Sequence, residues 1–75
     1  MISLDKVNKK IGTNSSGKDV LEVSLNADTA AEVQAIGTNP ATVEGFPANA
    51  VIAPFSDAFT ADKELLILGS NGTWK

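Results

Sequence analysis

The sequence predicts a small, mainly β domain, built as an antiparallel sheet or β-meander with one short α-helix. Three observations favour this fold class. Residues 20–25 alternate apolar and polar side chains, residues 29–36 have the cap and spacing of a short helix, and residues 54–74 contain two turn sequences in a short span. A chain of 75 residues has room for one such domain, which would be marginally stable by itself.

The charges divide the chain into two parts. Residues 1–18 contain four lysines and one acid, whereas residues 19–62 contain seven acids and no base. We therefore predict a basic N-terminal arm and linker at residues 1–18, ahead of a small β-rich domain at residues 19–75. Such an arm either remains solvated or meets an acidic surface.

The local structure of this arm is ambiguous in the sequence. Residues 2–5 alternate apolar and polar types as a strand does, but Leu4, Val7 and Ile11 fall at helical intervals. Residues 12–17 are small, turn-forming types, which predict a linker or a mobile loop.

Residues 20–25 predict the most regular strand of the domain. Leu21, Val23 and Leu25 alternate with polar side chains, so one face of the strand is apolar and the other polar. This alternation is typical of a strand that is buried on one side.

A short helix is predicted from Thr29 to Ile36. Thr29 and Glu32 have the spacing of a capping box, and Gly37 is placed to end the helix. A helix of this length is not stable alone, so we expect it to pack on the sheet through Val33 and Ile36.

Residues 38–53 predict a long irregular connection, because prolines, a glycine and small residues are scattered through them. Connections of this length tend to be functional or to be ordered by a partner. Phe46, Pro47, Val51 and Ile52 are therefore the first candidates for an interface.

The C-terminal third predicts neighbouring antiparallel strands. Residues 61–64 form a polar break after Phe59, and Asn71-Gly72 is a turn that tolerates positive φ. The aliphatic run at residues 65–68 lacks alternation, which predicts a strand covered on both faces. One cover is the core, and the other is a neighbouring subunit or, equally, the helix or long loop. Trp74 is either a plug of the core or an interface anchor.

The composition argues against catalysis. The chain has no histidine, cysteine or tyrosine and its carboxylates are dispersed, so we expect no enzyme activity, metal or cofactor. Residues 12–18 have the glycine and lysine spacing of a phosphate-binding loop, but Asp19 replaces the required hydroxyl residue. An acidic chain without arginine does not predict nucleic-acid binding, and no apolar stretch is long enough to span a membrane.

The C-terminal segment resembles that of small structural proteins of tailed bacteriophages. These proteins often end in Pro-Gly-Ser-x-Ala-Tyr-Thr-x-Asp, a hydrophobic strand, and then Leu-Gly-x-Asp-Gly-Thr-Trp-Lys. The likeness extends more loosely upstream, over residues 20–75. The chain departs from the pattern at Phe55, where glycine is usual, at Phe59 in place of tyrosine, and at Asn71 in place of an acid. The positions that correspond to the pattern, with Phe59 and Asn71 as conservative replacements, are Pro54, Ser56, Ala58, Phe59, Thr60, Asp62, Leu68, Gly69, Asn71, Gly72, Thr73, Trp74 and Lys75.

The resemblance implies a virion component and not an enzyme. We expect a capsid decoration or head-surface protein that binds the major capsid protein or other virion proteins, and that is found in the host cytoplasm before assembly. A homotrimer follows by analogy with a three-fold axis of a capsid lattice. The interface candidates are Lys6, Lys9, Lys10, Phe46, Pro47, Val51, Ile52, Phe55 and Trp74.

Other functions remain open at this point. A neck, tail or fibre-base component fits the same resemblance. A small acidic phage inhibitor that covers a basic site on a host protein fits the acidic stretch at residues 19–62. A glycan-binding β module would need exposed aromatic side chains, with Trp74 among them.

Overall fold

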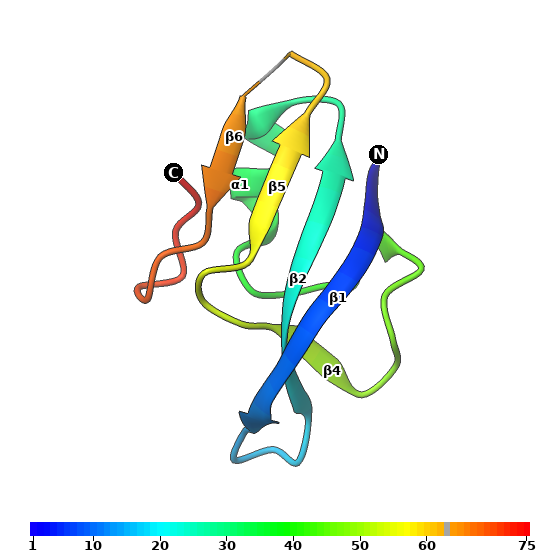
Figure 1. Ribbon diagram of the computed structural model, residues 1–75, viewed down its shortest axis with the longest axis vertical. Coiled ribbons are helices and arrows are strands. Elements are labelled where there is room, and N and C mark those ends of the chain that lie inside the picture. The colour runs from blue at the N-terminus through cyan, green and yellow to red at the C-terminus, as the bar shows by residue number, and fades with distance from the viewer. Residues whose placement is uncertain (63) are drawn as a thin grey trace.

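The strand β2 (Asp19–Ala27) is the centre of the molecule. A computed structural model describes residues 1–62 and 64–75, and these form one sheet and one helix (Figure 1). β2 pairs antiparallel with β1 (Ile2–Thr13) along one edge. Its other edge pairs with two short strands in turn, β4 (Ala50–Ile52) and then β5 (Asp57–Thr60), both parallel to it.

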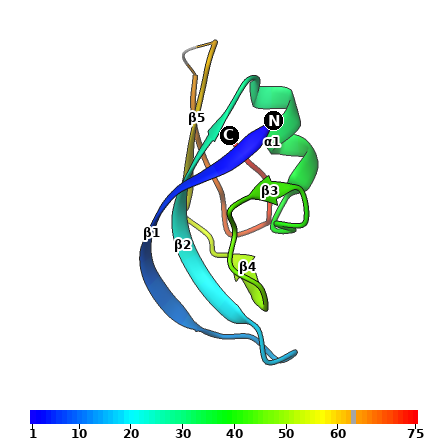
Figure 2. The same ribbon diagram turned by 90° about the vertical axis from the view of Figure 1, so that its right-hand side faces the viewer.

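The predicted mainly β fold with one helix is confirmed, but the sheet is mixed and not antiparallel throughout. β3 (Val43–Glu44) pairs parallel with β1, and β6 (Leu65–Ile67) pairs antiparallel with β5. The path of the sheet is β3-β1-β2-β5-β6. The helix α1 (Ala30–Ile36) follows β2 and lies across one face of the sheet (Figure 2). Of the strands after it, β4 and β5 run parallel to β2, whereas β3 and β6 run antiparallel to it.

The predicted strand at residues 20–25 lies inside β2, with the expected faces. Leu21, Val23 and Leu25 are buried in the core, and the residues between them are partly exposed. α1 and the segments that carry β3 and β4 lie on this same side of the sheet (Figure 2). We call this side the inner face and the opposite side the outer face.

Residues 1–18 are not an arm and linker, because residues 2–13 are the long strand β1. The register of β1 on β2 shifts three times, between Leu4 and Lys6, between Val7 and Lys9, and between Lys10 and Gly12. Each shift is a bulge that adds one residue to β1. Leu4, Val7 and Lys10 therefore face Leu25, Val23 and Leu21 at a spacing of three residues, and this spacing imitates a helix in the sequence.

Residues 14–17 form the turn that joins β1 to β2. The Asn14 side chain accepts hydrogen bonds from the backbone N–H of Ser16 (3.0 Å) and of Lys18 (2.9 Å). Gly17 has a φ of 79°, which favours glycine. The turn-forming composition was interpreted correctly as a loop, but the loop closes a hairpin and does not link separate parts.

The predicted helix is confirmed with its cap. Thr29 is the N-cap and accepts a hydrogen bond from the backbone of Glu32, whose carboxylate in turn accepts one from Asp28 N–H. Val33 is buried in the core and Ile36 packs against it, as expected. The Met1 ammonium lies 2.8 Å from Asp28 Oδ2 and 2.9 Å from Glu32 Oε1, which ties the start of β1 to the start of the helix.

The connection at residues 38–53 is more regular than predicted, because it contains β3 and β4. The expected turn at Asn71-Gly72 is present: Gly72 has a φ of 83° and Gly69 N–H donates to the Thr73 carbonyl. Trp74 then pairs with Leu68 in an isolated bridge. Of the predicted break at residues 61–64, Lys63 lies outside the described residues.

A buried serine holds the junction between β4 and β5 against β2. Val23 N–H donates to Ser56 Oγ at 3.0 Å, and the Ser56 hydroxyl donates to the Ala53 carbonyl at 2.7 Å. Ser56 is fully buried. Its hydroxyl thus supplies an acceptor for β2 at the point where neither short strand reaches it.

We expect Ser56→Ala to lower the free energy of unfolding by about 1–3 kcal/mol, because the Val23 N–H would remain buried without an acceptor. Urea denaturation followed by circular dichroism measures the loss, and faster hydrogen exchange of the Val23 amide locates it. Ser70→Ala, at an exposed position, is the control. Equal stability of the two variants would contradict this role for Ser56.

The Met1 ammonium makes stability depend on alkaline pH. Hydrogen bonds to Asp28 and then Glu32 raise the pKa of this amine above its usual 8.0. A raised pKa in the folded state stabilises the protein fully below pH 8 and progressively less as the pH rises through the raised value. As the pH rises above 8, we expect the wild type to lose stability more steeply than Asp28→Asn/Glu32→Gln. Parallel profiles in urea denaturation would contradict this coupling.

Candidate interaction surfaces

The outer face of the sheet carries a stripe of exposed apolar side chains on β5 and β6. Phe59 stands opposite Leu65 in the register, and Ile67 follows on the same face. Their exposed fractions are 54%, 62% and 41%. Together they expose about 300 Å² of apolar surface, which is the size at which patches on small proteins are often functional. We call these three residues the apolar stripe.

The stripe contradicts the expectation that residues 65–68 are covered on both faces. Leu66 and Leu68 are buried, whereas Leu65 and Ile67 are exposed, so the run alternates as a strand with one covered face does. The helix and the long connection both lie on the inner face (Figure 2). Within the described residues, neither supplies the second cover that the sequence predicted.

Two of the predicted lysines lie across the same outer face from the stripe. Lys6 is opposite Ser24, Ser24 is opposite Asp57, and Asp57 is opposite Ile67, so one row crosses four strands from a base to an apolar residue. Lys9 is opposite Glu22 in the next row. The outer face thus joins a basic edge to an apolar edge.

Lys10 lies apart from the other two lysines. Its position opposite Leu21 belongs to the inner-face series of β1. Its ammonium lies 3.2 Å from Asp19 Oδ1, in an exposed ion pair that closes the hairpin end. An exposed pair of this kind contributes little to stability.

Phe55 is the most exposed aromatic side chain, and its backbone is strained. It is 68% exposed and has a φ of 71°, a conformation that glycine adopts freely and that costs other residues about 1–2 kcal/mol. Its N–H donates to the Leu68 carbonyl at 2.7 Å, so the backbone is held by the sheet. Glycine is the residue that the phage pattern has at this position.

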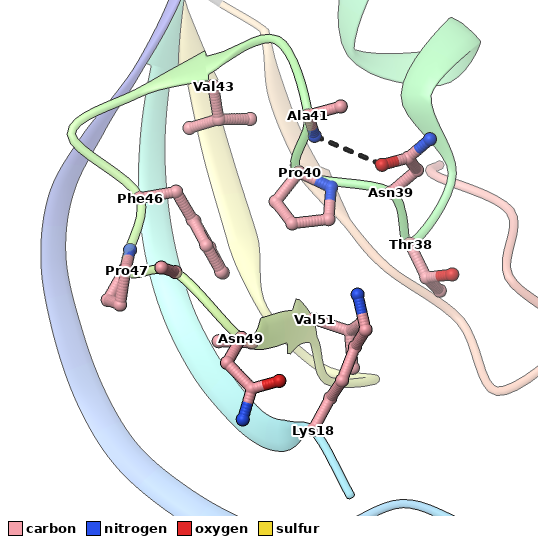
Figure 3. A pocket seen from close by; sticks show the side chains of 12 residues that line it. Lys18, Thr38, Asn39, Pro40, Ala41, Val43, Phe46, Pro47, Asn49 and Val51 are labelled. Atoms are coloured by element: carbon pink, nitrogen blue, oxygen red, sulfur yellow. Dashed lines mark hydrogen bonds between the residues drawn. The ribbon is translucent and has the colours of Figure 1, made fainter. Parts of the chain in front are cut away.

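An open hollow lies beside β4, between residues 38–41 and 46–51 (Figure 3). Its volume is about 450 Å³, and Pro40, Phe46, Pro47 and Val51 form its apolar walls. Asn39 shapes the wall by accepting a hydrogen bond from Ala41 N–H at 3.0 Å. The predicted candidates Phe46, Pro47 and Val51 are therefore brought together in one place.

The Lys18 side chain reaches toward this hollow in Figure 3. Lys18 is exposed, and among the described residues it has no carboxylate within ion-pair distance. The hollow therefore combines several apolar side chains with a mainly polar lining and one positive charge at its mouth.

Ile52 and Trp74 are corrections to the predicted interface. Both are about 1% exposed and lie in the core of this chain. Trp74 Nε1–H donates to the Gly37 carbonyl at 2.8 Å, which pins the C-terminal segment to the end of the helix. Trp74 is thus the core plug and not an interface anchor, and it is not exposed as a glycan-stacking residue would be.

Sequence reasoning missed the apolar stripe, Lys18 and Pro40. The stripe has a signal in the sequence, because Phe59, Leu65 and Ile67 flank a short turn at the separation that pairs them in a hairpin. Lys18 and Pro40 have none, since only the folded chain brings them together.

The described residues contain no group of three or more acidic, histidine or cysteine side chains able to hold a metal ion. In the same part of the chain, no helix has the length and apolar character needed to cross a membrane. Comparison with protein-family models, with curated proteins and with solved structures finds no match for this chain.

We expect Phe55→Gly to raise the free energy of unfolding by roughly 0.5–1 kcal/mol, because relief of the strained φ outweighs the added freedom of the unfolded chain. Phe55→Ala removes the ring but keeps the strain, so its stability should lie within about 0.5 kcal/mol of the wild type. Urea denaturation compares the three proteins. A loss of stability in both variants would show that the ring packs on the fold.

Proposed function

We propose that this chain is a non-enzymatic structural protein of a tailed-bacteriophage virion, specifically a decoration protein that binds the capsid surface and stabilises the lattice. The observation that carries the proposal is the apolar stripe, Phe59, Leu65 and Ile67, which no described part of the chain covers. Several large apolar side chains of this chain are exposed, but these three are grouped on one face of two paired strands, and a group of this kind favours a partner that covers it.

The outer face also suggests how the partner is recognised. Lys6 and Lys9 lie on the same face as the stripe, so a partner with an apolar patch beside an acidic one fits both edges. Binding to the folded chain stabilises each partner by mass action, which is the work of a decoration protein. The likeness of residues 54–75 to phage structural proteins supports a capsid as that partner.

The rival functions differ in what they require. A neck, tail or fibre-base component would use the same outer face in few copies. An acidic inhibitor would need a dense set of free carboxylates, but three of the seven acids of residues 19–62 are already paired, Asp28 and Glu32 with the Met1 ammonium and Asp19 with Lys10. The geometry therefore favours a structural role over the inhibitor.

Quantitative mass spectrometry of purified particles from a phage that encodes this chain tests its place in the virion. We expect a copy number equal to that of the major capsid protein or a simple fraction of it. A dozen or fewer copies per particle would replace decoration with a neck or tail position. Absence from the particle would overturn the proposal and favour the inhibitor.

Phe59→Ser/Leu65→Ser should reduce binding to undecorated capsids at least tenfold, because it removes most of the apolar stripe while both residues are exposed in the free chain. Co-sedimentation with capsids over a range of protein concentrations measures the affinity. The matched control is Asn26→Ser, which alters an exposed polar neighbour on the same face. Unchanged affinity of the double variant, with a wild-type unfolding curve, would exclude the stripe as the attachment surface.

A further inference from the structure

The turn at Phe55 is required by the fold, but an aromatic side chain there is not, because glycine would make the same turn without strain. The Phe55 φ of 71° favours glycine, and the Phe55 ring is mostly in solvent. A strained residue with an exposed aromatic side chain points to a use outside its own chain, since strain of this kind is concentrated at binding sites. Aromatic side chains on a rigid backbone are also effective anchors, because little conformational freedom is lost when they bind.

The hollow beside β4 has the complementary form. Pro40, Phe46, Pro47 and Val51 give it apolar side chains, Lys18, Asn39 and Asn49 give it polar ones, and more of its exposed lining is polar than apolar. Its volume of about 450 Å³ is large enough for one aromatic side chain. It is open to solvent and lies on the inner side of the sheet, away from the apolar stripe. It is therefore a separate site from the surface proposed for capsid attachment.

The charges next to the two features are opposite. Asp57 lies two residues beyond Phe55, is partly exposed, and has no ion-pair partner among the described residues. Lys18 stands at the mouth of the hollow and likewise has none there. An aromatic side chain followed by an acid thus matches a hollow with apolar side chains in its walls and a base at its rim.

One molecule does not bring these two features together. In Figure 1 the connection between β4 and β5, which contains Phe55, swings to the side of β5 and β6, whereas β4 and the segment before it lie on the side of β1. Phe55 is not among the residues that line the hollow of its own chain, so seating it there requires a second copy. Such a contact is head-to-tail, and it repeats from copy to copy.

We propose that copies of this chain associate head to tail, with Phe55 of one copy seated in the hollow of the next and Asp57 beside its Lys18. Each copy then inserts its own Phe55 side chain, which we call the knob, into one neighbour and receives the knob of another. The assembly is therefore a closed ring or an open chain, according to the rotation at each contact. Phe55 and the hollow lie outside the apolar stripe, but Asp57 stands opposite Ile67 on the outer face, so the two proposed contacts adjoin at that residue.

Two variants each remove one side of the proposed contact and leave the other side intact. Phe55→Gly removes the knob and leaves the hollow, and it is expected to be more stable than the wild type. Ala48→Trp fills the hollow from an exposed position and leaves the knob. Phe59→Ser, in the apolar stripe, is the control for association through the outer face.

Sedimentation velocity of the purified chains, at concentrations from about 10 μM to 1 mM, measures association. We expect the wild type and Phe59→Ser to associate, each of the other two variants to be monomeric, and their equimolar mixture to form a 1:1 heterodimer and nothing larger. The heterodimer follows because the mixture retains one intact knob that fits one intact hollow.

The proposal would be overturned by a monomeric wild type throughout this range, by association of Phe55→Gly or Ala48→Trp equal to that of the wild type, or by a mixture that remains monomeric. Loss of association in Phe59→Ser would also overturn it, because the contact would then run through the stripe. Particles are absent from this experiment, so its failure would leave capsid attachment untouched, and failure of capsid binding would leave this contact untouched.

Charge reversal supplies a second, independent measurement. Lys18→Asp and Asp57→Lys should each weaken association at least fivefold, since each places like charges at the contact. The double variant Lys18→Asp/Asp57→Lys should recover association, because every contact between its copies again pairs a base with an acid. Failure of the double variant to recover, with its fold intact by circular dichroism, would contradict the predicted pairing.

Discussion

The fold depends on how the backbone N–H and C=O groups along the second edge of β2 find hydrogen-bond partners. No single strand pairs with the whole of that edge: β4 covers its start and β5 its end, and the Ser56 hydroxyl accepts the Val23 N–H between them. The free-energy cost of leaving a buried N–H without an acceptor is a substantial part of the free energy of unfolding of so small a domain. The chain must therefore turn sharply between the two short strands, and it does so at Ala53 to Ser56. The strained φ of Phe55 is part of that turn.

The inner and outer faces follow from the bulges of β1. Each bulge adds a residue and increases the local twist, and the hairpin of β1 and β2 curves strongly in Figure 2. Lys6 and Lys9 are left on the outer face, opposite Ser24 and Glu22, while Leu4 and Val7 face β2 residues of the core. The same register that builds the core thus sets two lysines in line with the apolar stripe.

Local signals predicted the parts of the fold that local interactions decide. The alternation at Leu21, Val23 and Leu25, the cap at Thr29 and the turn at Asn71-Gly72 depend on neighbouring residues, and all three are confirmed. The strand β1 was missed because bulges replace the period of two with a period close to that of a helix.

The sites were harder to predict than the elements that carry them. Whether residues 65–68 are covered on one face or two depends on which side of the sheet α1 packs, and this is decided by pairings between distant segments. The hollow likewise joins Lys18 to residues 38–51, which only the parallel pairing of β4 with β2 brings together. The sequence contains these residues but not the distances between them.

The two proposed surfaces complement each other energetically. The apolar stripe offers about 300 Å², well below the roughly 800 Å² that each partner buries in a stable protein interface. A single copy held by the stripe and two lysines would therefore bind a capsid weakly. Copies joined through the proposed Phe55 contact would bind as a unit, and each attachment would then raise the effective concentration of the next. A repeating lattice offers the equally spaced sites that such a unit needs, whereas a single soluble host protein does not. A weak outer face combined with a head-to-tail contact is thus a design suited to a repeating surface, and this favours the capsid over an isolated target.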